Sequence, residues 1–216
     1  NKNCLIPNSS VIKDLSGNGN NATIFNNPGY NSKYSSYGSL TFNGTSTYIN
    51  TNYQPLVGLG AYSMSCWIKT SFSQLCGIIG FREWIGNPHL VLGIGTLGFG
   101  APAGTVICNS WNGGTQTSQV TTKNYNDSIW HNIHFSHTPT SDKLYVDGVL
   151  YADILHVSSA FDVSSNVLIG CMPGGNVPLS GYYYKGEIGA ACCYNVELTN
   201  DEVLTNYNAL KKYFLQ

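Results

Sequence analysis

The chain has 216 residues, of which 42% are hydrophobic and only 10% are charged, and its net charge is -1. This length suits an all-β domain, so we expect a single domain over residues 1–216. The sparse, balanced charge excludes the basic surface with which nucleic-acid-binding proteins hold phosphates, and it excludes a polybasic membrane anchor. The 15 tyrosines and 24 glycines favour strands and turns over helices.

Alternation of apolar and polar residues predicts strands in the first half of the chain. Residues 38–50 predict two short strands joined at Asn43-Gly44 in a type I′ hairpin. Residues 62–69 alternate with period two, and residues 75–81 form a weaker strand. The uncharged stretch 90–108 is long enough for a membrane helix, but its glycines predict two strands around a loop. We therefore expect no membrane insertion.

The second half continues the pattern. Residues 130–137 alternate strictly, with Ile133 and Phe135 on one face. The strongest hairpin spans residues 143–151, where Asp147-Gly148 can adopt the positive φ angles of a type I′ turn. Late strands are expected over residues 167–170 and 187–195, which brings the total to roughly a dozen.

One segment at the C-terminal end follows the helical period instead. Apolar residues recur at helical spacing over residues 199–214. Thr199 is a suitable N-cap, and Glu202 three residues later completes a capping box. We expect a short helix over about residues 199–214 that packs on the strands.

The order of these motifs resembles the laminin-G-like, concanavalin A-like lectin/glucanase domains. The resemblance starts at residues 14–23, DLSGNGNNAT, and continues through 38–44, 62–69, 130–133 and 144–148 to 184–195. It implies an all-β fold: a concanavalin A-like jelly-roll sandwich of two curved antiparallel sheets with a short C-terminal helix.

The ending over residues 202–214 is similar to a variant found in structural proteins of bacteriophages and large DNA viruses. This likeness implies a virion surface module, either a capsid decoration or a fibre or adhesion protein. Its partners would be other virion or surface proteins within a larger assembly. Its location would be the virion surface or the extracellular space.

Hydrolases of this superfamily carry an E-x-D-x-E or E-x-D-x-x-E strand, which places an acid and a nucleophile on one face. Here only Glu197, Asp201 and Glu202 cluster, and they flank the start of the expected helix. We therefore expect no enzyme. Two alternatives stay open: a glycoside hydrolase that lacks the usual carboxylate motif, and a purely structural assembly protein without a ligand.

Glycan binding requires exposed aromatic rings that stack on sugars and neutral amides that hydrogen-bond to their hydroxyls. The candidate residues that offer this chemistry are Trp84, Trp111, Asn112, Tyr125, Tyr182 and Tyr183. Three successive tyrosines, 182–184, cannot all face inward on a strand. The same neutral surface also suits a protein contact.

The family resemblance also implies one structural calcium ion, held by Asp14 in the opening motif and Glu187 near the last strand. Carboxylate oxygens are the ligands that calcium prefers. The alternative is that Asp14 caps its own turn and that Glu187 is a surface residue.

His131, His134 and His137 look like a metal-binding tract. On a strand, however, His131 and His137 share a face six residues apart and His134 points the other way. We therefore expect structural polar roles for all three.

The seven cysteines show neither zinc-binding nor disulfide-framework spacing. We expect free thiols, which favour assembly in a reducing compartment.

Overall fold

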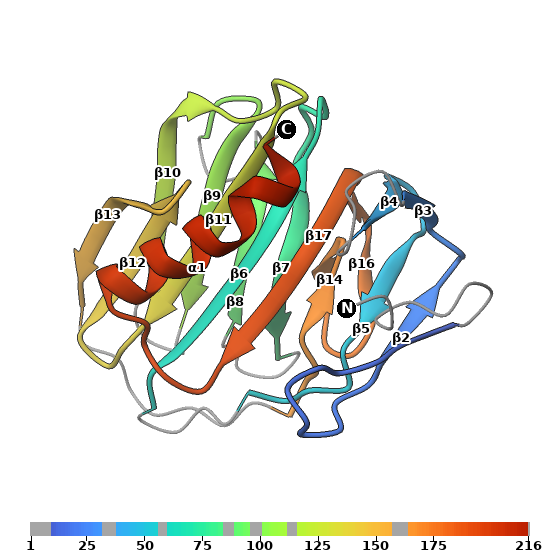
Figure 1. The fold of residues 1–216 in the computed structure, drawn as a ribbon, viewed down its shortest axis with the longest axis horizontal. Coiled ribbons are helices and arrows are strands. Elements are labelled where there is room, and N and C mark those ends of the chain that lie inside the picture. The colour runs from blue at the N-terminus through green and yellow to red at the C-terminus, as the bar shows by residue number, and fades with distance from the viewer. Residues whose placement is uncertain are drawn as a thin grey trace.

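Two antiparallel β-sheets stack face to face, and a single helix lies on the outer side of one of them (Figure 1). The computed structural model describes residues 10–31, 38–55, 60–83, 89–95, 101–111, 116–156 and 164–215. Within these ranges the expected all-β sandwich with a C-terminal helix is confirmed.

The first sheet has eight strands in the spatial order β1-β2-β5-β14-β7-β8-β9-β10. Their bounds are β1 Val11–Ile12, β2 Ala22–Phe25, β5 Tyr48–Asn50, β14 Leu168–Ile169, β7 Cys76–Arg82, β8 His89–Gly95, β9 Thr105–Trp111 and β10 Gln116–Asn124. Strands from both ends of the chain therefore lie side by side in this sheet.

The second sheet has seven strands in the spatial order β13-β12-β11-β6-β17-β4-β3. Their bounds are β13 Val149–Leu155, β12 Ser141–Val146, β11 Trp130–His137, β6 Tyr62–Lys69, β17 Lys185–Tyr194, β4 Ser39–Asn43 and β3 Gly29–Asn31. The predicted strand regions are present, and the structure adds several short strands to them.

The core forms between the two sheets from side chains of alternate residues. On β6, Met64, Cys66 and Ile68 face the core, as the alternation predicted. On β11 the same face carries Ile133 and Phe135, both fully buried. They meet apolar residues of β7, β8 and β9 from the opposite sheet.

The helix α1, Asn200–Phe214, covers the outer face of the seven-stranded sheet (Figure 1). Thr199 caps it, and the side chain of Glu202 completes the predicted capping box. Beneath the helix, Trp67 stacks on Phe214 with ring centroids 4.8 Å apart, and Trp130 packs against the same ring. No helix of the described residues has the length and apolar character that a membrane span requires.

The hairpin expected at Asn43-Gly44 is wrong, because its two strands belong to different sheets. Strand β4 lies in the seven-stranded sheet and β5 lies in the eight-stranded one. The Asn43 side chain accepts hydrogen bonds from the backbone of Thr45, Ser46 and Thr47, which turns the chain from one sheet to the other. The same asparagine-glycine signal can thus begin a crossover instead of a hairpin.

The hairpin predicted at Asp147-Gly148 is confirmed. Both residues have positive φ angles, 53° and 79°, as a type I′ turn requires. The register of β12 and β13 shifts by one residue at a β-bulge between Leu144 and Tyr145. A shift of one residue exchanges the two faces of a strand, so everything in β13 beyond the bulge is reoriented.

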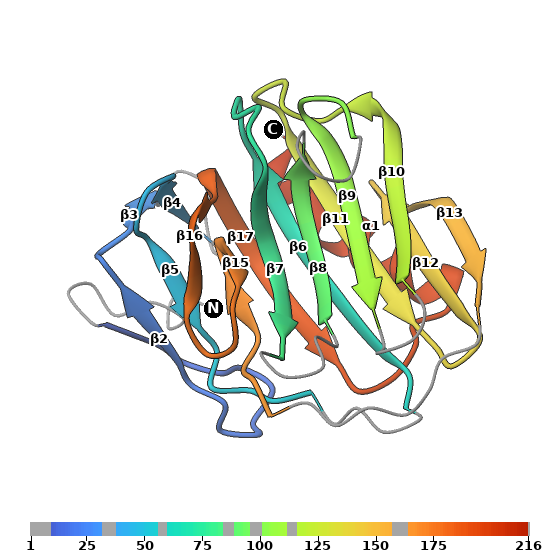
Figure 2. The ribbon, with the colours of Figure 1, turned by 180° about the vertical axis from the view of Figure 1, so that it is seen from behind.

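A separate hairpin folds over the outer face of the eight-stranded sheet (Figure 2). Its strands are β15 Cys171–Pro173 and β16 Pro178–Tyr183. It approaches β7 so closely that a Cβ on Gly77 would lie 2.3 Å from the Cys171 carbonyl oxygen. Only glycine fits at that point, because any side chain would displace the hairpin.

Six of the seven cysteines lie in the described residues, and all six are free thiols. Four of them are buried in the sandwich. Burial raises the pKa of Cys76 and of Cys193 to about 12, so these thiols stay neutral and behave as small apolar groups.

Candidate functional site

A stacked pair of aromatic rings lies on the outer face of the eight-stranded sheet. Phe25 on β2 and Tyr48 on β5 face each other across the strands, with ring centroids 4.5 Å apart and planes inclined by 2°. Their neighbours Ile24 and Ile49 pack on the core, so alternation directs both rings outward. Phe25 is 37% exposed.

The β15–β16 hairpin brings a third aromatic residue to this pair. Tyr183 pairs with Cys171 across this hairpin, and burial, followed by interaction with Cys171 and Tyr183, raises the pKa of Tyr48. Tyr182 beside it is exposed, whereas Tyr184 is fully buried. We call the group of Phe25, Tyr48 and Tyr183 the aromatic platform; Tyr182, the preceding residue of β16, points to the opposite face of that strand.

Neutral amides surround the aromatic platform. Asn50 lies two residues from Tyr48, on the same face of β5, and its side-chain oxygen accepts hydrogen bonds from Asn166 and from the backbone of Asn52. The Asn166 backbone in turn donates to the side chain of Asn176, 2.7 Å away. Flat rings beside amides are the chemistry that sugar recognition uses.

The remaining predicted ligand-binding residues do not join the aromatic platform in the described contacts. Trp111 ends β9, where its half-buried ring lies 6.1 Å from that of His89. Tyr125 is only 7% exposed and packs edge-on against His131, so its ring offers little surface to a sugar. Trp84 and Asn112 lie outside the described residues.

The sequence analysis named Tyr182 and Tyr183 as candidates but did not name Phe25 and Tyr48. Both missed residues occupy outward positions of short strands, a signal that the sequence contains. Their side-by-side placement depends on the pairing of β2 with β5, which are separated by more than 20 residues of chain.

Several carboxyl groups are engaged in hydrogen bonds that lower their pKa. Burial would raise the pKa of Glu83, but hydrogen bonds from Ser165 and Ser164 outweigh it and lower that pKa. Lowered pKa values are also found for Asp14, Asp127, Asp142 and Glu202. These five pKa shifts are opposite in direction to the raised pKa that a glycosidase general acid needs.

Asp14 and Glu187, the predicted calcium ligands, bind different neighbours. Burial would raise the pKa of Asp14, but hydrogen bonds from Ser16 and Asn20 within its own turn lower it. Glu187 accepts hydrogen bonds from Asn31 and Ser39. No described contact joins the two carboxylates, so a shared calcium ion stays a prediction that this geometry does not support.

The three histidines of β11 alternate as predicted. His131 and His137 lie on one face, whereas His134 lies on the other, beneath α1 and edge-on to Tyr145. Burial lowers the pKa of His134 to about 4, so this ring is neutral at pH 7. The three do not share a ligand, but His137 has other partners that the sequence did not reveal.

A laminin-G family model, described as the concanavalin A-like lectin/glucanases superfamily, matches residues 43–204. The chain belongs to this superfamily. The comparison confirms the resemblance of the motifs and the sandwich that it implied. No curated protein sequence matches the superfamily member described here at a significant level.

Solved structures resemble this concanavalin A-like chain in fold. The binding domain of Paraclostridial Mosquitocidal Protein 1 matches with a TM-score of 0.68, at 16% identity, over 93% of this chain and 50% of that chain. The botulinum neurotoxin serotype G binding domain matches with 0.69, at 12% identity, over 92% and 48%. The botulinum neurotoxin serotype D ligand binding domain, solved in complex with N-acetylneuraminic acid, matches with 0.66, at 17% identity, over 92% and 48%. The chain thus spans about half the length of the solved chains that it matches.

Proposed function

We propose that the chain is a non-catalytic lectin module that binds glycans through the aromatic platform. The observation that carries the proposal is the outward-facing stack of Phe25 and Tyr48 with Tyr183 beside it. Membership of the lectin/glucanase superfamily supports it, as does the structural likeness to a binding domain solved with a sialic acid.

The absence of catalysis is part of the proposal. Two carboxyl groups in different protonation states are needed to cleave a glycosidic bond. Described carboxylates are held by histidine, lysine, hydroxyl and backbone groups, as at Asp147, Glu197 and Glu83. A hydrolase without the family motif would have to release product from a glycan panel, and we expect none.

We further propose that the module is displayed on a virion surface or in another extracellular assembly. The viral likeness of the C-terminal segment supports this setting. The six free thiols fit folding in a reducing compartment before display.

A glycan array that contains sialylated and neutral glycans tests the binding. We expect Phe25→Ala and Tyr183→Ala each to weaken binding of any captured glycan about tenfold, the effect of about 1.4 kcal/mol of lost stacking. Because Phe25 stacks on Tyr48, its truncation should also lower the melting temperature by a few degrees, so binding is compared at a temperature at which each variant is folded.

Trp111→Ala is the matched control, because it removes an aromatic ring at the other end of the same sheet. If only this variant loses glycan binding, the binding site lies at the end of β9 and not at the aromatic platform. If no glycan on the array is bound and the protein co-sediments with virion particles, the lectin proposal is wrong. The chain would then be an assembly protein without a ligand.

A further inference from the structure

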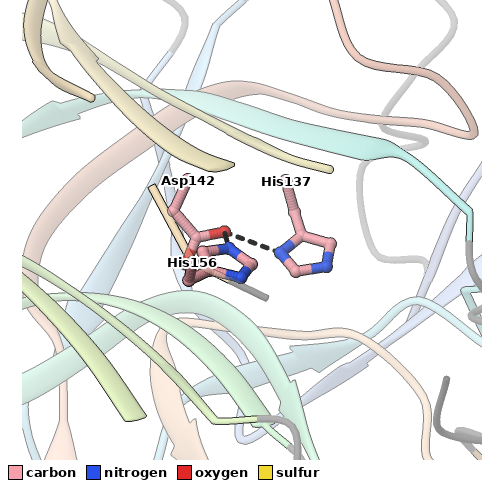
Figure 3. A group of neighbouring side chains, drawn as sticks. All are labelled: His137, Asp142 and His156. Carbon is pink, nitrogen blue, oxygen red and sulfur yellow. Dashed lines mark hydrogen bonds and ion pairs between the residues drawn. The ribbon is translucent and has the colours of Figure 1, made fainter. Parts of the chain in front are cut away.

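Three side chains with metal-ligating atoms converge at one end of the sandwich. His137 ends β11, Asp142 is the second residue of β12, and His156 directly follows β13. Figure 3 shows the two imidazole rings beside the Asp142 carboxylate. One ligand atom from each residue lies within 4.8 Å of the other two, and this is the only such group of three among the described residues.

The group is buried and closely spaced. His137 Nδ1 lies 2.6 Å from Asp142 Oδ1, and His156 Nε2 lies 3.1 Å from the same oxygen. The side chains are 6%, 1% and 4% exposed for His137, Asp142 and His156. The two imidazole rings are nearly parallel, with centroids 5.4 Å apart.

The fold fixes the three positions through the backbone. His137 and Asp142 are cross-strand partners on β11 and β12, so their side chains point to the same face. The bulge in the β12–β13 pairing makes Ile154 the partner of Asp142. His156, two residues further, therefore points to the same face as Asp142, and its backbone N–H donates to the Thr140 carbonyl.

The second oxygen of Asp142 ties the group to the opposite sheet. Asp142 Oδ2 accepts hydrogen bonds from Ser110 on β9 and Thr117 on β10, both at 2.5 Å. Burial would raise the pKa of Asp142, but His137, Ser110 and Thr117 outweigh it and lower that pKa. The buried carboxylate is thus ionised and oriented, as the outer hydrogen bonds of a metal ligand commonly achieve.

His156 is the unexplained member of the group. Neither of its ring nitrogens makes a hydrogen bond among the described residues, although both are buried. Native proteins seldom leave a buried polar side chain without a partner. A cation between the two imidazoles and the carboxylate would bind the lone pair of a His156 ring nitrogen, which no hydrogen-bond donor occupies.

Tyr62 and Cys108 are the further titratable groups beside these three side chains. The Tyr62 ring stacks on His137 with centroids 4.8 Å apart. Burial, followed by the charge of Asp142, raises the pKa of both Tyr62 and Cys108, so both are neutral.

We propose that His137, Asp142 and His156 bind one divalent transition-metal ion, with zinc as the best match, and that this ion joins the ends of the neighbouring strands β11, β12 and β13. Two imidazoles and one carboxylate suit zinc with water as the fourth ligand, whereas calcium and magnesium prefer oxygen ligands. Ligand atoms of a tetrahedral zinc site lie roughly 3.3 Å apart, so the 3.1 Å contact already fits and the 2.6 Å contact must lengthen.

The test uses the full chain, stripped with a chelator and then titrated with zinc or cobalt. We expect one zinc ion per chain and a rise in melting temperature of about 5–10 °C at a hundredfold excess over Kd. Cobalt should give the visible absorption of a tetrahedral site, and calcium should give neither effect.

His156→Gln is the informative variant, because it removes one imidazole ligand and leaves His137 and Asp142 in place. We expect it to fold, as a cooperative melt of the metal-free protein would show, and to lose the zinc-dependent shift and the cobalt spectrum. His131→Gln is the matched control on the same face of β11, and it should bind zinc as the wild type does. Absence of zinc uptake by the wild type, or equal uptake by His156→Gln, would overturn the proposal.

Discussion

The two ends of β11 combine histidine and aspartate in opposite proportions. At its beginning, His131 lies between two carboxylates: Nδ1 is 2.8 Å from Asp147 and Nε2 is 3.2 Å from Asp127. At its end, a single carboxylate, that of Asp142, lies between His137 and His156. The same residue types thus form two different groups: one imidazole with two carboxylates at the beginning of β11, and one carboxylate with two imidazoles at its end.

Burial decides what each arrangement does. Asp127 and Asp147 are about one third exposed, so water shares their charge and each nitrogen of His131 has its own acceptor. Burial lowers the pKa of His131, but the hydrogen bonds and charges of Asp147 and Asp127 outweigh it and raise that pKa. At the other end water is excluded, and the second imidazole has no hydrogen bond. The first arrangement favours a proton and the second favours a metal ion.

The largest difference should appear when one carboxylate is neutralised at each end. Asp142→Asn leaves His137, Ser110 and Thr117 facing an amide in the interior, and we expect a loss of about 4 kcal/mol in the free energy of unfolding. Asp147→Asn keeps a residue that tolerates positive φ and should cost less than about 1 kcal/mol. Urea unfolding at pH 7 measures both, and equal losses would contradict the assigned difference in burial.

His134 should make the protein sensitive to acid. Its folded pKa of about 4 lies below the usual 6.5, so the unfolded chain takes up the proton first. The contribution of the neutral His134 ring to the free energy of unfolding is fully present above pH 6.5. It falls by about 3 kcal/mol as the pH drops to 4. In His134→Gln this part of the pH dependence should disappear from unfolding curves recorded between pH 7 and 4.

His131 should act with the opposite sign and a smaller size. Its raised folded pKa gives a contribution that is fully present below pH 6.5 and is lost as the pH rises through that pKa. His131→Gln should therefore flatten the decline of stability on the alkaline side, measured between pH 6 and 9. Because its acidic partners are partly exposed, the effect should shrink in high salt; an effect that persists there would contradict this explanation.

The smallest effect is expected at Asp14, a carboxylate that neither imidazole group uses. It is held by its own turn, so a calcium chelator should leave the melting temperature unchanged within about 1 °C. A clear drop, lost in Asp14→Asn, would restore the calcium site that the family resemblance implies.

Local signals predicted most of the fold because they report local physics. The capping box at Thr199 and Glu202 and the turn at Asp147-Gly148 depend on residues a few positions apart, and both are confirmed. The alternation on β6 and β11 likewise assigned each side chain to the correct face. The hairpin predicted from Asn43-Gly44 is wrong, because a local turn signal does not determine which sheet the following strand joins.

The candidate sites were harder, because each combines distant segments. His156 would face away from Asp142 in an unbroken hairpin counted from Asp147-Gly148, and only the bulge reverses it. The aromatic platform needs β2, β5 and the β15–β16 hairpin together, although Tyr182 and Tyr183 were recognisable as exposed candidates.

The sequence by itself determined the strands, their inward faces, the C-terminal helix and the family, because periodicity, caps and turns are encoded over a few residues. The tertiary structure alone decided which strands are neighbours, where the register shifts and which polar groups lose contact with water. Those are properties of chain segments brought together across the sandwich, and the stacked Phe25 and Tyr48 and the Asp142 cluster both depend on them.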